Sequence, residues 1–585
     1  MFRAIAIFSV VSFVITTGEP TSAADASPDA LLSPPPSKFF RRQYHKSDLS
    51  FCNSRVCVDF DGDGRRELLF SSRKTKELQM LNAANGSVIW SKKLIGDSQS
   101  LAAHDLNGDK EFEILYSVSN PGRLYVLDRK GTVLQQWDSG DWKLGNSAVI
   151  LDADGDGQLD GLLGSRSKFL IRLNMSDLTL AAQRSGWIQC GCHATAMDVD
   201  NDGRWDIFAG SGDDSSMNGF LHRYDPVTLK SVWSYETNDN ASSADPVLVD
   251  IDGDGKVEII KSVDNYAHDD AHDAIHALKT DGTRLWKTSG FSGEDSPNVA
   301  DLDGDGEVEI VGMTFGCEVY CLDSKGHVRW QRDLRPELSD HTHAYMAPIL
   351  CDVNGDQTLE IVALTNGGYF DQRNKSNVEP VPAIIFALSA KGEILDRFEV
   401  GGRRYWGDAF ICNVDSDPFL ELIATGSGGL DIIEMRGLGP NTEHFQRRRN
   451  YQRLNVVPWA YEDSYFIYRG TKEGVVNRTD NLVLSKQDGA YLSSGKYSTE
   501  LLTLPPGGYF ARITYDSRTP RGTTICLRII DRSGKPIAVN VKSGSSFNIH
   551  QSVRLEFTFT SKQPTTTPIL DGYVLNFDRT QSRLP

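Results

Sequence analysis

Residues 250–258 read Asp-Ile-Asp-Gly-Asp-Gly-Lys-Val-Glu, and residues 301–309 repeat the pattern as Asp-Leu-Asp-Gly-Asp-Gly-Glu-Val-Glu. Six further nine-residue stretches follow the same alternation, starting at Asp59, Asp105, Asp152, Asp198, Asp352 and Asn413. Successive starts lie 46 to 61 residues apart. A repeat of this period is typical of propellers and solenoids, in which each repeat is one supersecondary unit.

The segments between the loops carry short, alternating apolar runs, which indicate strands. In the fifth repeat these runs cover residues 246–249, 258–260, 274–278 and 283–286. Four strands per repeat make one propeller blade. A glycine turn joins the third and fourth runs, and a tryptophan follows, as in Gly282 and Trp286. The other turns have Gly86, Gly131, Gly326 and Gly392, and the other tryptophans are Trp90, Trp137, Trp233 and Trp330. We therefore predict an all-β fold, a seven- or eight-bladed β-propeller with eight blades favoured, in which the tryptophans wedge between neighbouring blades.

The loop spacing suits a hard divalent cation. Ca²⁺ takes six to eight oxygen ligands, and carboxylates at loop positions 1, 3, 5 and 9 with a backbone carbonyl at position 7 supply them within one turn. An EF-hand does not fit, because its acidic residue falls at position 12 and its flanks are helical. We expect several structural Ca²⁺ ions as cofactors. The candidate metal ligands are Asp59, Asp61, Asp63, Arg65, Glu67, Asp105, Asn107, Asp109, Glu111, Glu113, Asp152, Asp154, Asp156, Gln158, Asp160, Asp198, Asp200, Asp202, Arg204, Asp206, Asp250, Asp252, Asp254, Lys256, Glu258, Asp301, Asp303, Asp305, Glu307, Glu309, Asp352, Asn354, Asp356, Thr358 and Glu360.

The eight loops are not equally equipped. Those starting at Asp59, Asp152, Asp198, Asp250 and Asp301 keep all four carboxylates. The second loop has Asn107 at position 3 and Lys110 in place of Gly at position 6, and the seventh has Asn354 and Gln357 at the same two positions. The last loop begins with Asn413 and has Pro418 at position 6, so we interpret it as a structural turn without a cation.

The repeats resemble the FG-GAP or VCBS family, whose calcium-loop blades also form the propeller of integrin α-subunits. The lead-in of the family is matched by residues 296–301, Ser-Pro-Asn-Val-Ala-Asp, and by residues 347–352, Ala-Pro-Ile-Leu-Cys-Asp. The resemblance covers about residues 50 to 440. It implies a calcium-binding propeller of the kind used in binding and cell adhesion. The second half of each blade, such as residues 80–90, is also similar to the repeat of quinoprotein propellers.

The chain ends differ from the repeats. Residues 1–24 have Arg3, an apolar run and small residues, which is the layout of a secretory signal peptide, with a membrane anchor as the alternative. Residues 25–45 form a Pro/Ser-rich linker. The propeller then covers 46–456, a connector 457–480, and a β-sandwich of the jelly-roll type 481–585, where alternating runs recur without acidic loops. We expect a secreted protein, extracellular or periplasmic, with no membrane insertion after signal cleavage.

The composition argues against one class of binding partner and limits how the cysteines can pair. The net charge of −18 argues against nucleic acid, since such binding depends on Lys and Arg neutralising phosphates. Nine cysteines are an odd number, so at least one is a free thiol or bonds another chain. Cys52 and Cys57 lie close enough in the sequence for a local bridge. Cys190 and Cys192 stand beside His193 without the spacing of a zinc site, and core packing or a disulfide is favoured for them.

If each acidic loop joins the first two strands of a blade, the longer connections lie on the opposite rim. They are residues 212–219, 264–273, 333–346, 366–382 and 401–408, and the last four carry histidine, arginine or aromatic side chains. Aromatic rings stack on sugars and guanidinium groups bind carboxylates. The ligand-binding candidates are His268, His272, His341, His343, Tyr345, Arg403, Arg404 and Trp406. Solvated loops without a ligand are the alternative interpretation.

Two functions remain from these observations. The first is an extracellular binding or adhesion protein for a polysaccharide or a cell-surface protein. The alternative is a polysaccharide lyase acting on acidic glycans, because family-eleven rhamnogalacturonan lyases are similar calcium-rich propellers. That resemblance would make His268 and His272 candidate bases and Arg403 and Arg404 a clamp for the uronate. The catalytic residues are otherwise unknown.

Overall fold

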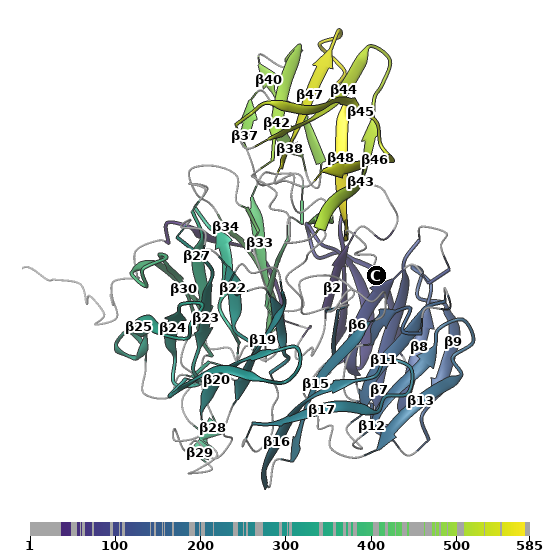
Figure 1. Cartoon of the computed structure of the whole chain (residues 1–585). Helices are drawn as coiled ribbons and strands as arrows, with labels where there is room; N and C mark the ends of the chain where they lie inside the picture. The colour runs from purple at the N-terminus through teal and green to yellow at the C-terminus, as the bar shows by residue number, and fades with distance from the viewer. Residues whose placement is uncertain are drawn as a thin grey trace, which may run out of the picture. The chain divides into compact units, whose positions relative to one another are not determined.

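The computed structural model describes residues 37–579 with gaps. The gaps are residues 48, 50–54, 59, 61–64, 73–74, 94–97, 105, 108–110, 141, 145–147, 155, 157, 166–168, 186–193, 198, 200–204, 214–215, 238–243, 250, 253–255, 264–272, 292–294, 301, 304–306, 339–342, 345, 355–357, 367–369, 372–375, 378–382, 402–408, 413, 416–418, 427–428, 436–441, 444–460, 463–470, 474, 479–480, 488–489, 500–507, 532 and 550–552. The predicted signal peptide and most of the linker lie outside these residues. Apart from the single 3₁₀ turn η1 (Arg335–Glu337), the regular elements in the described residues are β-strands, coloured along the chain in Figure 1.

Eight antiparallel sheets follow one another in the described part of residues 40–443, and we number them as blades 1 to 8 in chain order. Blade 1 consists of β2 (Arg55–Val58), β3 (Glu67–Ser72), β4 (Glu77–Asn82) and β5 (Val88–Lys93). Blade 2 consists of β6 (Ser98–His104), β7 (Glu113–Ser119), β8 (Gly122–Leu127) and β9 (Val133–Asp138). Blade 3 consists of β10 (Val149–Leu151), β11 (Asp160–Ser165), β12 (Phe169–Asn174) and β13 (Leu180–Ser185), and blade 4 of β14 (Thr195–Met197), β15 (Asp206–Asp213), β16 (Ser216–Tyr224) and β17 (Ser231–Glu236).

The second four sheets have the same strand order. Blade 5 consists of β18 (Val247–Val249), β19 (Glu258–Val263), β20 (Ala274–Lys279) and β21 (Arg284–Ser289), and blade 6 of β22 (Asn298–Ala300), β23 (Glu309–Met313), β24 (Glu318–Leu322) and β25 (Val328–Asp333). Blade 7 consists of β26 (Ile349–Asp352), β27 (Glu360–Leu364), β30 (Ala383–Leu388) and β31 (Ile394–Gly401), with β35 (Thr442–Glu443) paired to β26 and the small hairpin β28 (Phe370–Asp371) and β29 (Ser376–Asn377) inserted. Blade 8 consists of β32 (Phe410–Cys412), β33 (Leu420–Gly426), β34 (Gly429–Met435) and β1 (Phe40–Lys46).

Burial differs between the strands of one blade, and the sequence explains why. The second strand of blade 5, β19, is buried at every position, and Ile259, Ile260 and Val263 are its apolar residues. The fourth strand, β21, alternates between exposed and half-buried side chains and reads Arg-Leu-Trp-Lys-Thr-Ser. A strand packed on both faces needs continuous apolar residues, whereas an edge strand with one wet face alternates. The blades therefore bury their inner strands and expose the fourth.

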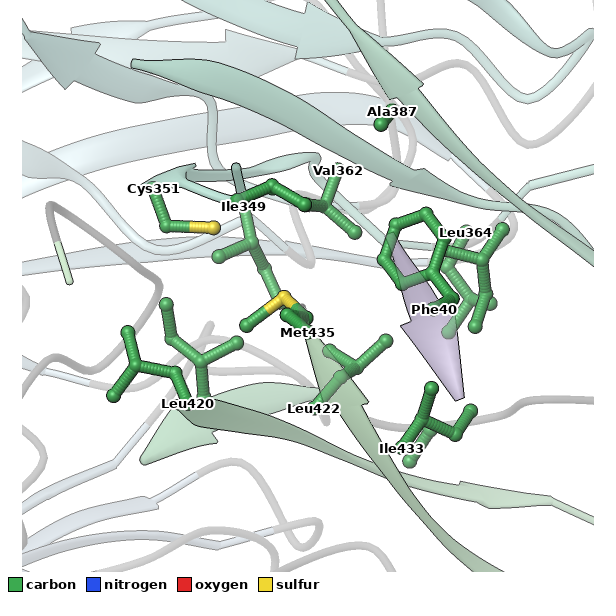
Figure 2. Packing of buried hydrophobic residues seen from close by; sticks show 14 of the residues in the cluster. Phe40, Ile349, Cys351, Val362, Leu364, Ala387, Leu420, Leu422, Ile433 and Met435 are labelled. Carbon is green, nitrogen blue, oxygen red and sulfur yellow. The ribbon is translucent and has the colours of Figure 1, made fainter. Parts of the chain in front are cut away.

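Nonpolar clusters join each blade to the next and the last blade to the first. One cluster of buried residues lies between blades 7 and 8, where Ile349, Cys351 and Val362 face Leu420, Leu422 and Ile433 (Figure 2). Six further clusters join the successive pairs from blades 1 and 2 to blades 6 and 7. An eighth cluster joins Ile423 and Ile432 of blade 8 to Leu68 and Phe70 of blade 1. This cyclic packing of antiparallel sheets confirms the β-propeller.

The strand that closes the ring comes from the start of the described chain. Strand β1 pairs antiparallel with β34, with Phe40 opposite Met435 and Lys46 opposite Leu430. It thereby supplies the fourth strand of blade 8, whose first three strands come from residues 410–435. The linker predicted for residues 25–45 therefore ends too late, because residues 40–45 are a propeller strand. Local composition did not show this, since the partner strand is nearly four hundred residues away in the sequence.

The predicted tryptophan wedges are present. In four blades the indole nitrogen donates to a carbonyl in the glycine turn of the next blade, as Trp286 Nε1 does to Ser324 O at 3.0 Å. The other three bonds are Trp90 to Arg129 O, Trp233 to Thr280 O and Trp330 to Ala390 O, each at 2.9 Å. Gly326 has φ of +80°, and a β-carbon there would lie 2.6 Å from the Trp286 ring. The turn must therefore contain glycine, both for its backbone conformation and for the ring lying on it.

A tyrosine has the same position at the ring closure. Tyr44 of β1 lies against Gly86 of blade 1, and its hydroxyl donates to Ala83 O at 2.7 Å. Lys46 adds a bond from Nζ to Gly86 O at 2.6 Å. Trp137 packs against the cluster between blades 2 and 3. The fourth strand of one blade therefore holds the turn of the next, also where the two ends of the propeller meet.

The carboxyl-terminal part forms two sheets. The first contains β36 (Tyr461–Glu462), β38 (Val475–Arg478), β39 (Asn481–Leu484), β43 (Gly508–Arg518), β46 (Ser545–Ile549) and β48 (Ile569–Arg579). The second contains β37 (Thr471–Glu473), β42 (Ser494–Ser498), β44 (Thr523–Asp531), β45 (Pro536–Val541) and β47 (Val553–Ser561), and β40 (Lys486–Gln487) pairs with β41 (Ala490–Tyr491). One nonpolar cluster includes residues of both sheets, as expected for a β-sandwich. The predicted connector 457–480 is wrong in part, because β36, β37 and β38 already belong to these sheets.

Candidate metal centre

All eight acidic loops share one hydrogen bond, which defines their turn. The carboxylate at position 9 starts the second strand of each blade and accepts a bond from the backbone N–H at position 2. In the sixth loop, Leu302 N donates to Glu309 Oε2 at 2.8 Å. The equivalent pairs are Phe60–Glu67, Leu106–Glu113, Ala153–Asp160, Val199–Asp206, Ile251–Glu258, Val353–Glu360 and Val414–Glu421, at 2.8 to 3.2 Å. The last loop thus has the same bond between positions 2 and 9 as the seven others.

These position-9 acids are buried, each less than a tenth exposed. Burial is the largest influence on the pKa of Asp160 and raises it, while Arg172 and the Ala153 amide lower it. Burial likewise raises the pKa of Glu309, opposed by the Leu302 amide and Arg329. A buried carboxylate is stabilised by any cation or donor close to it. The loops therefore place their last carboxylate where a positive charge or a hydrogen-bond donor is needed.

The third loop is the one described almost completely. Carboxylate oxygens of Asp152, Asp154 and Asp156 lie within 4.8 Å of one another. Oxygens that share one Ca²⁺ at 2.3–2.6 Å lie within such a distance, so the three side chains fit the ion. The loop is held by a bond from Asp156 N to Asp152 Oδ1 at 3.1 Å and one from Gln158 N to Asp156 Oδ1 at 2.8 Å. Positions 1, 3 and 5 of this loop converge as the spacing predicts.

Arginines contact the position-9 acids in three of the loops that keep all four carboxylates. Arg172 of β12 donates to Asp154 at 2.8 Å and to Asp160 at 3.1 Å, both through Nη1. In the fourth loop, Arg223 Nε donates to Asp206 at 2.8 Å. In the sixth loop, Arg329 bonds Glu309 and also donates to Asp303 at 2.8 Å. The sequence pattern did not indicate these arginines, because they lie on other strands of the blade.

We call the loops of blades 2, 7 and 8, which lack the full set of four carboxylates, the weak loops. In each of them an amide group, in place of an arginine, contacts the position-9 acid. Asn107 Nδ2 donates to Glu113 Oε1 at 3.1 Å, and Asn354 Nδ2 donates to Glu360 Oε1 at 3.0 Å. In the last loop the amide comes from the closing strand: Gln43 Nε2 donates to Asp415 at 3.0 Å and to Glu421 at 3.3 Å. Each amide connects position 3 to position 9. A neutral donor there satisfies the buried carboxylate without a cation.

The remaining predicted metal ligands divide into two groups. Described are Arg65, Glu111, Asp252, Lys256, Glu307, Asp352 and Thr358, in addition to the residues above. Asp59, Asp61, Asp63, Asp105, Asp109, Asp198, Asp200, Asp202, Arg204, Asp250, Asp254, Asp301, Asp305 and Asp356 lie outside the described residues.

Of the eight predicted ligand-binding residues, only His343 is among the described residues. His343 is 3% exposed, stacks on Phe315 with ring centroids 4.7 Å apart, and has Nε2 3.3 Å from Asn366 Nδ2. It therefore lies inside its loop and does not present its ring to a ligand. His268, His272, His341, Tyr345, Arg403, Arg404 and Trp406 lie outside the described residues. Of the predicted connections, residues 212–219 are largely the ends of strands β15 and β16, so this segment is an extended hairpin rather than a loop.

The topology confirms which rim each connection occupies. In every blade the acidic loop joins the first strand to the second, and in blades 1 to 7 a short turn, with glycine in blades 1, 2, 5, 6 and 7, joins the third to the fourth. Both therefore lie at one end of the antiparallel sheets. The connections from strand two to strand three, and from strand four to the next blade, lie at the other end.

Fold and loops together define a repeat-built β-propeller with an acidic turn in every blade. Residues 198–260, which hold the fourth loop and the start of the fifth blade, match the model of the FG-GAP-like repeat. This match confirms the predicted FG-GAP-type repeats. A search of curated proteins finds no match for the sequence.

Solved structures resemble the chain at low identity. BamB from Moraxella catarrhalis is 13% identical, covers 68% of this chain and 97% of its own, and has a TM-score of 0.42. The V. cholerae biofilm matrix protein Bap1 is 13% identical over 72% of this chain and 96% of its own, with a TM-score of 0.43. Sqt1 of Saccharomyces cerevisiae is 11% identical over 67% and 98%, with a TM-score of 0.45. Within the described residues, no helix has the length and apolar character needed to cross a membrane.

Proposed function

We propose that this protein is a secreted, calcium-stabilised binding or adhesion protein. Its propeller supplies a rigid scaffold, and the rim opposite the acidic loops binds a polysaccharide or a cell-surface protein. The observation that carries the proposal is the shared turn of the acidic loops. The position-9 acids all accept the same backbone bond, so the repeats are built alike, and this supports a structural role for calcium in the loops that keep all four carboxylates. The ligand then binds at the rim opposite the acidic loops.

The calcium part of the proposal rests on the third loop and on the contrast with the weak loops. Asp152, Asp154 and Asp156 converge within 4.8 Å, which suits one ion. The loops at Asp59, Asp198, Asp250 and Asp301 have the same carboxylates in sequence. In the other three loops the amides of Asn107, Asn354 and Gln43 donate to the position-9 acid, which supports a loop without a cation. We therefore assign Ca²⁺ to five loops and none to the loops of blades 2, 7 and 8.

The ligand part rests on the topology. Long connections on a rigid scaffold are the usual place for binding residues. Residues 264–273, 333–346, 366–382 and 401–408 all connect strands at the rim away from the calcium loops. Their arginines and aromatic residues are suited to an acidic sugar, because guanidinium groups bind carboxylates in pairs of hydrogen bonds.

Binding of the purified protein to an array of acidic and neutral polysaccharides tests this assignment. Arg403→Ala and Arg404→Ala should each weaken the binding about tenfold or more, the loss of one charge-assisted contact. Lys325→Ala and Lys391→Ala, in glycine turns at the calcium rim, are the matched controls and should bind as the wild type does. Equal loss in both pairs, or no glycan or cell-surface binding at all, would overturn the proposed face. Release of unsaturated uronates would instead identify a polysaccharide lyase.

A further inference from the structure

Two cysteines meet where the ring closes. Cys57 lies on β2, the first strand of blade 1, and Cys412 lies on β32, the first strand of blade 8. Their Sγ atoms are 3.3 Å apart, although the residues are 355 positions apart in the sequence. Cys412 belongs to the nonpolar cluster between the two blades, and Cys57 packs against it. The pair therefore bridges the first and last blades of the propeller.

The distance is short enough for a covalent bond. A disulfide has an S–S length of about 2.05 Å, so the two sulfurs need to approach by roughly 1.3 Å. Rotation about χ1 of either side chain moves its sulfur by more than that without displacing the strands. Cys412 is 3% exposed, whereas Cys57 is partly exposed, so an oxidant reaches the pair through Cys57.

Noncovalent contacts alone otherwise hold the closure among the described residues. They include the pairing of β1 with β34, the packing of Tyr44 on Gly86, the cluster between blades 8 and 1, and the bonds from Lys46 to Gly86 O and from Arg55 to Thr425. A bond between the first strands of these blades would add a link that does not depend on β1. It would close a loop of more than three hundred residues, and a cross-link restricts the unfolded chain more as the loop lengthens.

We infer that Cys57 and Cys412 form a disulfide that covalently closes the propeller ring under oxidising conditions. The reaction needs an external disulfide, either a small-molecule one or that of a protein thiol oxidase. The Cys57 thiolate attacks one sulfur of that disulfide, its S–S bond breaks, and one thiol leaves. Cys412 then attacks the mixed disulfide at Cys57, and the second thiol leaves. The two protein thiols are oxidised and the external disulfide is reduced to two thiols.

This pairing differs from the bridge predicted between Cys52 and Cys57. Cys52 lies outside the described residues, and the prediction relied on closeness in the sequence alone. Blade-to-blade closure brings Cys57 to a partner that sequence spacing cannot suggest. The remaining described cysteines offer controls, because Cys526 is exposed on β44 of the sandwich and Cys317 is buried beside β24 of blade 6.

The test is a peptide map of the full chain before and after oxidation by oxidised glutathione, digested without reductant. We expect the peptides of Cys57 and Cys412 to be joined and two hydrogen atoms lighter than the separate thiols. The joined peptides should be absent from Cys57→Ser and Cys412→Ser and present in Cys526→Ser. Bonding of Cys57 to Cys52, or two thiols that remain unmodified, would overturn the inference.

A second measurement separates ring closure from incidental oxidation. The oxidised wild type should unfold at a higher temperature than the reduced protein, and the shift should disappear in Cys412→Ser. The shift should be retained in Cys526→Ser, which leaves the closure intact. An equal shift in Cys412→Ser, or the mapped bond without any shift, would show that the bond does not close the propeller.

Discussion

Replacing Glu309 with alanine removes the carboxylate that holds the turn of the sixth acidic loop. Glu309 is 2% exposed and accepts the Leu302 N–H at 2.8 Å through Oε2. Its other oxygen contacts Arg329, which also bonds Asp303. Leu302 is 3% exposed, so water does not readily replace the lost acceptor. The variant thus tests whether the position-9 acid is a structural part of the turn in the absence of calcium.

The magnitude follows from these contacts. A buried N–H that loses its acceptor costs about 1–3 kcal/mol. The Arg329 side chain is 35% exposed, and its bond with Glu309 adds about 0–1 kcal/mol after solvent screening. We therefore expect Glu309→Ala to destabilise the loop by about 1–4 kcal/mol in the presence of a chelator. Glu309→Gln keeps a carbonyl for the Leu302 N–H and should cost about 1 kcal/mol.

Hydrogen exchange resolved to the Leu302 amide measures this locally. A loss of about 1.4 kcal/mol speeds exchange through local opening tenfold, so Glu309→Ala, with a loss of about 1–4 kcal/mol, should accelerate it about fivefold or more. Glu307→Ala, an exposed change two residues away, is the matched control and should leave the rate within about threefold. Exchange in Glu309→Ala that equals the Glu307→Ala rate would refute the structural role of the position-9 acid. Added calcium should slow exchange in the wild type and less so in Glu309→Gln.

Three further predictions concern the wedges, the weak loops and pH. Trp286→Phe should cost about 1 kcal/mol of stability through loss of the bond to Ser324 O, measured by thermal unfolding, and an unchanged unfolding temperature would contradict it. Asn354→Asp should add one bound Ca²⁺ in a native mass spectrum; an unchanged count would mean that the amide is not what excludes the ion. Burial lowers the pKa of His276 to about 3 and of His222 to about 4. Because the unfolded chain takes up their protons from about pH 6.5 downward, stability should fall by roughly 1–2 kcal/mol per histidine at pH 5. Substituting both by Gln should flatten that pH profile, and an equally steep profile would count against these pKa values.

The sequence predicted what is repeated. Eight acidic loops in register predicted the blades, the joining of strands one and two, and the rim on which the loops lie. The glycine turns and tryptophans predicted the contacts between blades, since each recurs in five of the eight repeats. A feature present many times in one chain is a strong signal, because chance resemblance does not recur at a fixed period.

The sequence did not predict the structural features that lie outside the repeat and occur once in the chain. The closing strand β1 carries Gln43 and Tyr44, and its role depends on pairing with a strand at the other end of the propeller. Arg172 and Arg329 reach the loops from strands outside the motif. His343 stands in a polar stretch that reads as a surface loop, yet it packs on Phe315. These contacts depend on three-dimensional closure, for which no local pattern exists.

The number of bound calcium ions tests the central claim most directly. Native mass spectrometry of the intact protein, compared with and without a chelator, should give five ions, one for each loop with all four carboxylates. Removing them should lower the unfolding temperature. Eight ions would contradict the role of Asn107, Asn354 and Gln43 as substitutes for the cation. A protein that binds no calcium, or whose stability does not change when the ions are removed, would contradict the account of the loops as a calcium-stabilised scaffold.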